Sequence, residues 1–275
     1  FVLLCISMSF ELSVDFIDPR EVNPNAPLFV YLPGMDGTGK LLQTQSDHLA
    51  ANFDRQCVSV RINNHSPWQD LARDTVQLIR LELENKTNRE VYLCGESFGG
   101  CLALKTALAA PNLISKLILV NPASSFNQLP ILSWGVDITG FLPSWVHRYS
   151  AAGLLPFLVR LNRIDDCDRD RLIESMKSIP PHVISWRLSL LRDFKVLDEE
   201  LRSLNIPSLI VAGAADGLLP SVAEAQKLTR LLPQGQMIVL PQSGHACLLE
   251  TEINLYKILI QQNFISAQTK LLVKL

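Results

Sequence analysis

A serine at position 97 has a glycine two residues away on either side, in the segment Gly95-Glu-Ser-Phe-Gly99. The apolar run before it predicts a strand, and the run that follows predicts a helix. On a sharp strand-to-helix turn the serine backbone is strained, and the glycines keep neighbouring Cβ atoms from clashing. A helix that begins there also directs its N-terminus at the reacting atoms, where it stabilises negative charge. We therefore predict that Ser97 is a nucleophile held by Gly95 and Gly99.

A nucleophilic serine needs a base, and histidine is the usual one. Of the five histidines, His245 follows a late predicted strand and stands in the small-residue turn Gln242-Ser-Gly-His245. From there its side chain can reach back over the carboxyl ends of a sheet. His65 also follows a predicted strand and is the competing candidate, whereas the other histidines fall in predicted helices or in the strand-free region 122–205. We predict His245 as the base.

The base in turn needs an acid that orients its ring. Asp216 lies in Gly213-Ala-Ala-Asp-Gly217, just after a predicted strand, and it gives the chain order Ser, Asp, His that is typical of one class of hydrolase. An aspartate before glycine also commonly caps a turn or a helix, which is the simpler interpretation. Asp193 and Asp198 are the alternative acids, although neither follows a predicted strand. We predict Asp216.

Such a site also needs donors for an oxyanion. The backbone N–H of Phe98, directly after the serine, is one candidate. The second is expected from the glycine-rich loop Leu32-Pro-Gly-Met-Asp-Gly-Thr-Gly39, in which Gly34 allows close approach and Met35 supplies the N–H. A phosphate loop is a weaker interpretation, because the segment lacks the G-K-[ST] ending that binds nucleotide phosphates and magnesium.

These residues require a scaffold of strands alternating with helices, which predicts a parallel sheet covered on both faces. Continuous apolar runs predict buried strands at 28–32, 57–61, 91–94, 117–120, 208–212 and 237–240. Helices are predicted at about 41–51, 67–84, 98–110, 220–231 and 249–264. Residues 10–17 alternate in polarity and predict an antiparallel edge strand.

The alternation stops between residues 122 and 205, where no strand is apparent. Residues 122–161 carry six aromatic and only three charged side chains, and residues 162–204 are charged and helical in pattern. We interpret 122–205 as a helical cap inserted between strands, with 1–121 and 206–275 as the core domain. A cap in that place would lie over the carboxyl ends of the strands, where ligands bind. Its aromatic side chains are expected to line an apolar acyl channel: Phe126, Trp134, Phe141, Trp145 and Phe157.

Composition excludes several classes of protein. A net charge of -2 gives no basic face for nucleic acid, and 48% hydrophobic residues provide for a substantial core. The uncharged run 117–136 is interrupted by polar residues and two prolines, so it does not predict a membrane span. The six cysteines are scattered without zinc spacing, which indicates a reduced, cytoplasmic location and no metal. We also expect translation to start at Met8.

The assembled pattern resembles the α/β-hydrolase superfamily over nearly the whole chain apart from the insertion. Three segments, 32–39, 95–104 and 117–123, are similar to the hydrolase-like part of the plant and cyanobacterial phytyl ester synthase (esterase/lipase/thioesterase) family. The resemblance implies the α/β-hydrolase fold, a mostly parallel doubly wound sheet with a helical cap. It also implies acyl-group chemistry on a lipid-like substrate.

We therefore predict a serine hydrolase or acyltransferase that forms an acyl-enzyme on an ester or thioester and needs no cofactor. Its partner is a small-molecule acyl compound, and peripheral contact with a lipid or membrane surface is compatible with the apolar cap. Two alternatives remain. The first is a non-catalytic binding protein that keeps the fold, and the second is a cofactor-free haloperoxidase or C–C bond hydrolase with the same three side chains.

Overall fold

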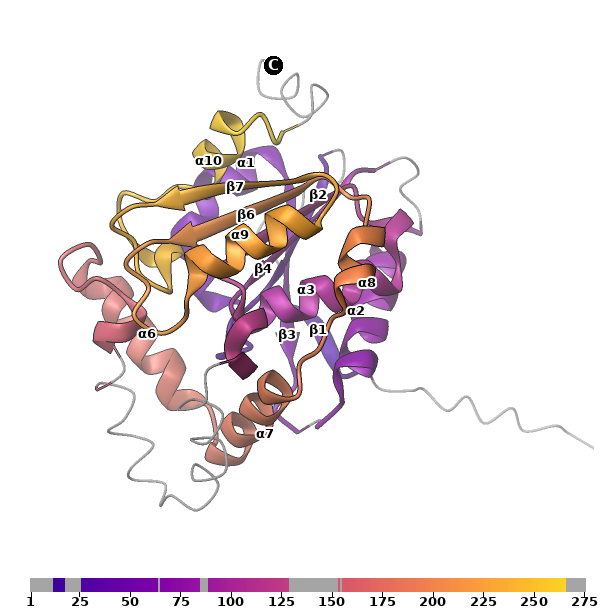
Figure 1. Cartoon of the computed structure of the whole chain (residues 1–275). Helices are drawn as coiled ribbons and strands as arrows, with labels where there is room; N and C mark the ends of the chain where they lie inside the picture. Colours follow the sequence, from indigo (N-terminus) through magenta and orange to yellow (C-terminus); the bar gives the residue numbers. More distant parts are fainter. Residues whose placement is uncertain are drawn as a thin grey trace, which may run out of the picture.

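The computed structural model describes residues 12–17, 26–63, 65–84, 89–128, 153 and 155–265, apart from the side chains of residues 46–48. Its centre is a seven-stranded sheet with the order β1-β3-β2-β4-β5-β6-β7 (Figure 1). All neighbouring strands run parallel except β1, which pairs antiparallel with β3 at one edge. The predicted parallel sheet with an antiparallel edge strand is thus confirmed. The strands are β1 (Val14–Ile17), β2 (Leu28–Leu32), β3 (Asp54–Val60), β4 (Val91–Glu96), β5 (Lys116–Val120), β6 (Ser208–Gly213) and β7 (Gly235–Leu240).

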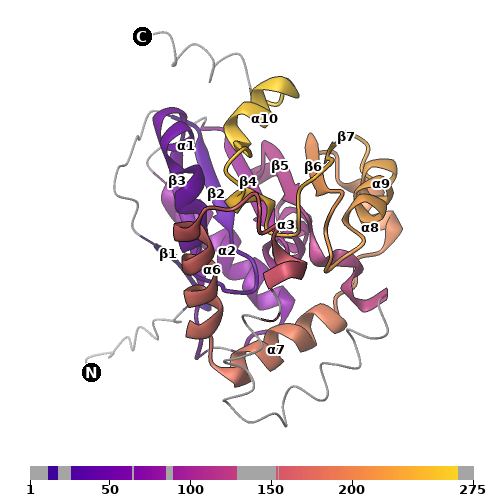
Figure 2. The ribbon, with the colours of Figure 1, turned by 90° about the vertical axis from the view of Figure 1, so that its left-hand side faces the viewer.

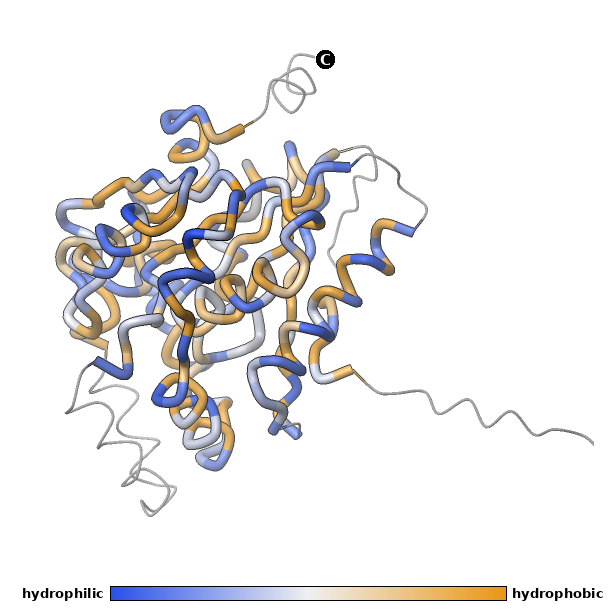
Figure 3. The backbone as a smooth tube through the Cα atoms, turned by 45° about the vertical axis from the view of Figure 1, so that its right-hand side comes forward, coloured by the Kyte–Doolittle hydropathy of each residue, from blue (hydrophilic) through white to orange (hydrophobic). Residues whose placement is uncertain are grey.

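Helices cover both faces of this sheet (Figure 2). Successive side chains of a strand point to opposite faces, and in β2 Val30 and Leu32 join one apolar cluster whereas Phe29 and Tyr31 join another. The first cluster includes residues of α2 (Trp68–Leu83), α3 (Phe98–Ala109) and α9 (Ser221–Leu231). The second includes residues of α1 (Ser46–Asn52) and α10 (Leu255–Gln261). Figure 3 shows hydrophobic residues gathered in the interior, with hydrophilic and hydrophobic residues alternating along the outer helices.

The described residues of the predicted insertion contain no strand. They form η3 (Ala123–Gln128), α6 (Asp166–Ser178), α7 (Pro181–Arg192) and α8 (Asp198–Ser203), and residues 155–158 are also helical. Ser175 of α6 and Arg187 of α7 each contact the loop that follows β2. These two helices therefore lie beside the carboxyl ends of the strands, where the predicted site residues also are. The division into a core and a cap stays a prediction.

Several element boundaries differ from the sequence prediction, and two of the differences have a physical reason in the contacts. β3 begins at Asp54, three residues before the predicted start. The buried Asp54 carboxylate can lie in the strand because it accepts a hydrogen bond from the Arg89 guanidinium at 2.5 Å. The predicted helix 249–264 is divided into η4 (Cys247–Leu249) and α10. The division arises because Glu250 turns into the core, and Asn254 then caps α10 by accepting a hydrogen bond from the Lys257 N–H.

Candidate active site

Ser97 sits at the turn between β4 and α3 with φ 52° and ψ −114°, a left-handed conformation that costs energy for a residue with a side chain. The turn is extremely tight. A Cβ atom at Gly95 would lie 2.2 Å from the carbonyl oxygen of Gly99, and one at Gly99 would lie 2.0 Å from that of Leu32. Only glycine fits at either position. The two glycines therefore let the chain present the serine side chain at the carboxyl end of the sheet.

The structure brings Ser97, His245 and Asp216 together. His245 Nε2 lies 2.8 Å from Ser97 Oγ, and His245 Nδ1 lies 2.7 Å from Asp216 Oδ2. An ionised carboxylate can only accept, so Nδ1 carries the proton and Nε2 is left to accept a proton from the serine hydroxyl. The imidazole is buried, which shields this chain of hydrogen bonds from water.

The Asp216 carboxylate is held by more than the histidine. Burial acts to raise its pKa, but hydrogen bonds from His245, from the Ser221 hydroxyl and from the Leu219 N–H outweigh it, so that the pKa lies below its ordinary value. The Leu218 N–H also bonds Oδ1, at 2.8 Å. The carboxylate is thus charged and fixed in orientation. The turn-capping role and the contact with His245 coexist in one side chain.

The loop after β2 lies beside the serine. A Cβ atom at Gly34 would be 3.8 Å from Ser97 Cβ, which places the segment next to the reacting hydroxyl. Phe98 is the first residue of α3, so its N–H has no partner within the helix. Asp36 fixes the far part of the loop by accepting hydrogen bonds from the Thr38 N–H and hydroxyl. Met35 and Phe98 as oxyanion donors stay a prediction.

Asn121, which follows β5, connects the ends of three strands. Its side chain donates to the carbonyl oxygens of Gly244 and His245 at 3.1 and 2.6 Å, and it accepts from the Gly213 N–H at 2.8 Å. Its own φ is 41°, a conformation in which asparagine is enriched. Sequence reasoning assigned this residue no role, although a polar residue that ends a buried strand could have drawn attention to it.

Glu250 holds the histidine loop from the other side. It is fully buried, and its two carboxylate oxygens accept from the Gly244 N–H at 2.7 Å and from the Arg163 guanidinium at 2.8 Å. The arginine also contacts Glu252 at 3.1 Å. Together with Asn121, this pair fixes the backbone on which His245 stands.

Glu96, the residue before the serine, is a buried acid that sequence reasoning left without a role. The Tyr31 hydroxyl donates a hydrogen bond to its carboxylate. Burial raises the pKa of Glu96 to about 7, against the lowering effects of that hydrogen bond and of His245. Burial also raises the pKa of Tyr31 well above its ordinary value, so the phenol remains a donor.

This acid should make stability depend on pH. Since the pKa of Glu96 is higher in the folded state than its ordinary value of 4.5, the folded protein binds more protons between about pH 4.5 and 7. Its free energy of unfolding therefore falls as pH rises through that window, by up to about 3 kcal/mol. Glu96→Gln should remove this contribution, and urea unfolding at pH 5 and pH 7.5 measures it.

The matched control for this experiment is Glu199→Gln, a change at an exposed carboxylate on α8. That variant should keep the pH slope of the wild type. If Glu96→Gln and Glu199→Gln give the same slope, Glu96 does not carry the dependence. Asp216 does not interfere, because its lowered pKa places its own stabilising contribution at more acid pH, where it is lost as pH falls.

The competing residues lie elsewhere. The ring of His65 packs against Trp186 at a centroid distance of 5.3 Å. Asp193 pairs with Arg192, and Asp198 with Arg202. None of these three candidates has a hydrogen bond to Ser97 or His245 among the described residues.

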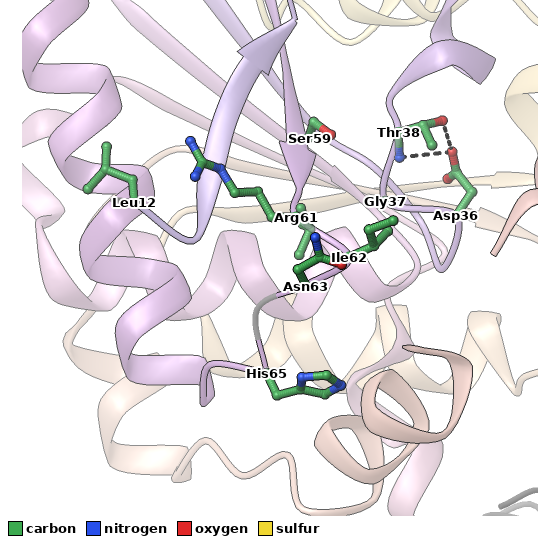
Figure 4. Close-up of a pocket in the computed structure, with 10 residues that line it drawn as sticks. Leu12, Asp36, Gly37, Thr38, Ser59, Arg61, Ile62, Asn63 and His65 are labelled. Carbon is green, nitrogen blue, oxygen red and sulfur yellow. Dashed lines mark hydrogen bonds between the residues drawn. The ribbon is translucent and has the colours of Figure 1, made fainter. Parts of the chain in front are cut away.

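A pocket of about 660 Å³ opens next to the loop after β2 (Figure 4). Its walls come from that loop, from the end of β3 and from the segment after it, and they carry both polar and apolar side chains. Figure 4 shows the Asp36–Thr38 hydrogen bonds on one side of the pocket and His65 on another. Ser97 does not line this pocket. The lining residues are Leu12, Asp36, Gly37, Thr38, Ser59, Val60, Arg61, Ile62, Asn63 and His65.

Two of the five predicted channel aromatics can be placed. Phe126 is buried in the apolar cluster on the α3 face of the sheet. Phe157 is 52% exposed, and its Cα would lie 3.3 Å from a Cβ atom at Gly217, next to the predicted acid. Trp134, Phe141 and Trp145 lie outside the described residues. The acyl channel stays a prediction.

Within the described ranges no group of three or more His, Cys, Asp or Glu side chains could hold a metal ion. None of the helices that the structure describes is long and apolar enough to cross a membrane.

Comparison with known proteins gives a family and several relatives. The family Hydrolase_4, described as serine aminopeptidase, S33, matches residues 60–252. Phytyl ester synthase 1, chloroplastic, of Arabidopsis thaliana is 30% identical over 262 residues, which cover 86% of this chain and 36% of that protein. The chain thus spans little more than a third of the length of this relative.

A shorter relative is covered almost completely. The pimeloyl-[acyl-carrier protein] methyl ester esterase of Vibrio campbellii is 30% identical over 233 residues, which cover 80% of this chain and 88% of the esterase. Among solved structures, an esterase from Exiguobacterium antarcticum superposes with a TM-score of 0.71 at 17% identity, covering 92% of this chain and 95% of the esterase. At that identity the superposition shows the fold alone, and the predicted α/β-hydrolase fold is confirmed.

Proposed function

The chain belongs to the serine aminopeptidase S33 family of α/β-hydrolases, and from this we propose that it transfers an acyl group from a lipid-like ester or thioester through Ser97. The observation that carries the proposal is the continuous set of hydrogen bonds from Ser97 through His245 to Asp216. Relatives named as esterases and hydrolases support an enzyme of the serine esterase type.

In the proposed reaction, His245 Nε2 takes the proton of Ser97 Oγ as the oxygen attacks the acyl carbonyl. Asp216 keeps the imidazole in the orientation and tautomer that this step needs and stabilises its charged form. The oxyanion is stabilised by the backbone N–H groups of Met35 and Phe98 and by the N-terminus of α3. His245 then returns the proton to the leaving group. Water or an alcohol resolves the acyl-enzyme with the same base.

The lipid-like nature of the substrate is supported by an apolar surface next to these residues. Phe157 and Leu161 are both about half exposed. The segment that carries them contacts the loop of His245, since the Ala246 N–H donates to the Leu158 carbonyl oxygen at 2.8 Å. It also packs on Gly217 beside the acid. Apolar side chains exposed there suit an acyl chain. A cytoplasmic location with peripheral contact to a lipid surface is part of the same proposal.

Chain length tests the substrate class. kcat/KM should rise from acetyl to octanoyl esters by up to about three orders of magnitude, because each buried methylene contributes about 0.8 kcal/mol. The series is measured on acetyl, octanoyl and palmitoyl esters below their aggregation limits. Phe157→Ser should flatten the rise, whereas Ile260→Ser, at an exposed apolar residue of α10, should leave it unchanged.

If acetyl esters are the best substrates, the lipid-like substrate class is wrong and the protein is a small-ester or thioester hydrolase. Activity that required halide and peroxide would instead favour the haloperoxidase alternative. Both results would leave the role of Ser97 to be judged by its own variant.

A further inference from the structure

An arginine of α7 reaches into the loop beside the serine. Arg187 is fully buried, and its Nη1 donates to the Met35 carbonyl oxygen at 2.6 Å while its Nη2 donates to the Val60 carbonyl oxygen at 3.0 Å. Val60 is the last residue of β3, and its N–H donates to the Gly37 carbonyl oxygen at 2.9 Å. One guanidinium therefore ties the loop after β2 to the end of the neighbouring strand.

Among the residues that the structure describes, this buried cation has no ion-pair partner. No carboxylate of the described residues lies within salt-bridge distance of Arg187, and its Nε has no hydrogen-bond partner there. Burial lowers the pKa of the guanidinium to about 10, with Asp36 opposing the shift. The guanidinium also lies 5.8 Å from the centroid of the Trp186 ring. A buried charge whose hydrogen bonds go to neutral carbonyl groups is expensive for a fold. A fold gains little net stability from such a charge, so the arginine is poorly explained by stability alone.

The loop is shaped around the guanidinium. Gly37 has φ +65°, and a Cβ atom there would lie 2.4 Å from Arg187 Nη2. The planar group thus packs directly on the glycine backbone. The preceding helix, α6, contacts the same loop, since the Ser175 hydroxyl donates to Asp36 Oδ2 at 3.2 Å. Both α6 and α7 therefore contact the segment that contains the candidate oxyanion donor.

We propose that Arg187 is a positioning residue that holds residues 33–39 so that the Met35 N–H faces the reacting carbonyl. The inference rests on the proposed function of Ser97. With the Met35 carbonyl oxygen fixed by the arginine and Gly34 in contact range of Ser97, the peptide between Gly34 and Met35 has little freedom to turn. Because Arg187 belongs to α7, the oxyanion donor is in place only while this helix lies against the loop after β2.

Arg187→Met tests the proposal by removing the donors and the charge while keeping an apolar stem. Its kcat, divided by the number of sites counted in an endpoint titration with a fluorophosphonate, should fall about 10- to 100-fold, somewhat less than after loss of an oxyanion donor itself. KM should change by no more than about twofold. Affinity for a trifluoromethyl ketone analogue of the substrate should fall by the same factor as kcat/KM.

A purely structural role would give a different pattern. It would lower the titrated fraction of sites and the melting temperature while kcat per titrated site stayed at the wild-type value, and this result would overturn the proposal. Arg192→Met, the same change at a partly exposed arginine of the same helix, should leave all three quantities unchanged. If Arg187→Met does not fold, Arg187→Gln carries the test, because glutamine is neutral and too short to reach both carbonyl oxygens.

The Arg187 and Ser97 variants distinguish a failure of the role of Arg187 from a failure of the proposed function. Loss of activity in Ser97→Ala together with an unchanged kcat in the Arg187 variants would overturn the role of Arg187 alone. Retained activity in Ser97→Ala would overturn the proposed function, whatever the arginine variants do.

Discussion

Replacing Ser97 by alanine should lower kcat on ester substrates by at least about three orders of magnitude. The side chain is the proposed nucleophile, and without it no acyl-enzyme forms. Folding should survive, because alanine keeps the Cβ atom and the backbone bond from residue 97 to the Val120 carbonyl oxygen. The hydroxyl itself bonds only His245 among the described residues. The loss is measured as kcat and as labelling by a fluorophosphonate probe.

Ser243→Ala is the matched control. This serine is also buried, lies near His245, and has a hydroxyl without a hydrogen-bond partner in the described part of the chain. Removing that hydroxyl should change neither kcat nor labelling appreciably. If Ser97→Ala keeps most of its esterase activity and is labelled normally, the nucleophile is another residue.

The largest effect on stability is expected from Gly99→Ala. The new Cβ atom would lie 2.0 Å from the Leu32 carbonyl oxygen and 2.5 Å from that of Pro33. Both are backbone atoms at the carboxyl end of β2. Neither can move without breaking the turn that carries Ser97. We expect a loss of at least about 4 kcal/mol in the free energy of unfolding, which is at the extreme of single substitutions. Urea denaturation, or the yield of soluble protein, measures it.

Gly153→Ala provides the comparison, because a Cβ atom there would meet no atom of the described residues within 4 Å. Its free energy of unfolding should stay within about 0.5 kcal/mol of the wild-type value. Equal stability of the two variants would mean that the turn before α3 is not as tight as the contacts indicate.

The strands and the three side chains at the candidate site could be predicted because their signals are local. Ser97 lies between two glycines at a strand end, and His245 and Asp216 each follow a strand. The alternation of apolar runs with helical segments is likewise a property of short windows of sequence. His65 satisfied the same local rule and could be separated from His245 only by chain order, because the sequence does not say how far apart two loops lie.

The residues that hold the site escaped prediction because their contacts join distant parts of the chain. Arg187 and Met35 are 152 positions apart, and Asn121 and His245 are 124 apart. An arginine on a charged, helical stretch ordinarily faces solvent, so nothing local distinguishes one that is buried. The polar start of β3 was missed for a related reason. Asp54 can enter a sheet because Arg89, far along the chain, neutralises it.

The order of the strands has a consequence for the chain as it leaves the ribosome. Among the described strands β7 is the outermost at its edge and pairs only with β6, and His245 follows it. A growing chain that has already produced β1 to β6 therefore displays Ser97 and Asp216 without the base that links them. Since domains fold as units during synthesis, the proposed acyl chemistry becomes possible only when β7 has docked. Under the proposed function, chains that have not yet docked β7 would be inert toward esters and thioesters.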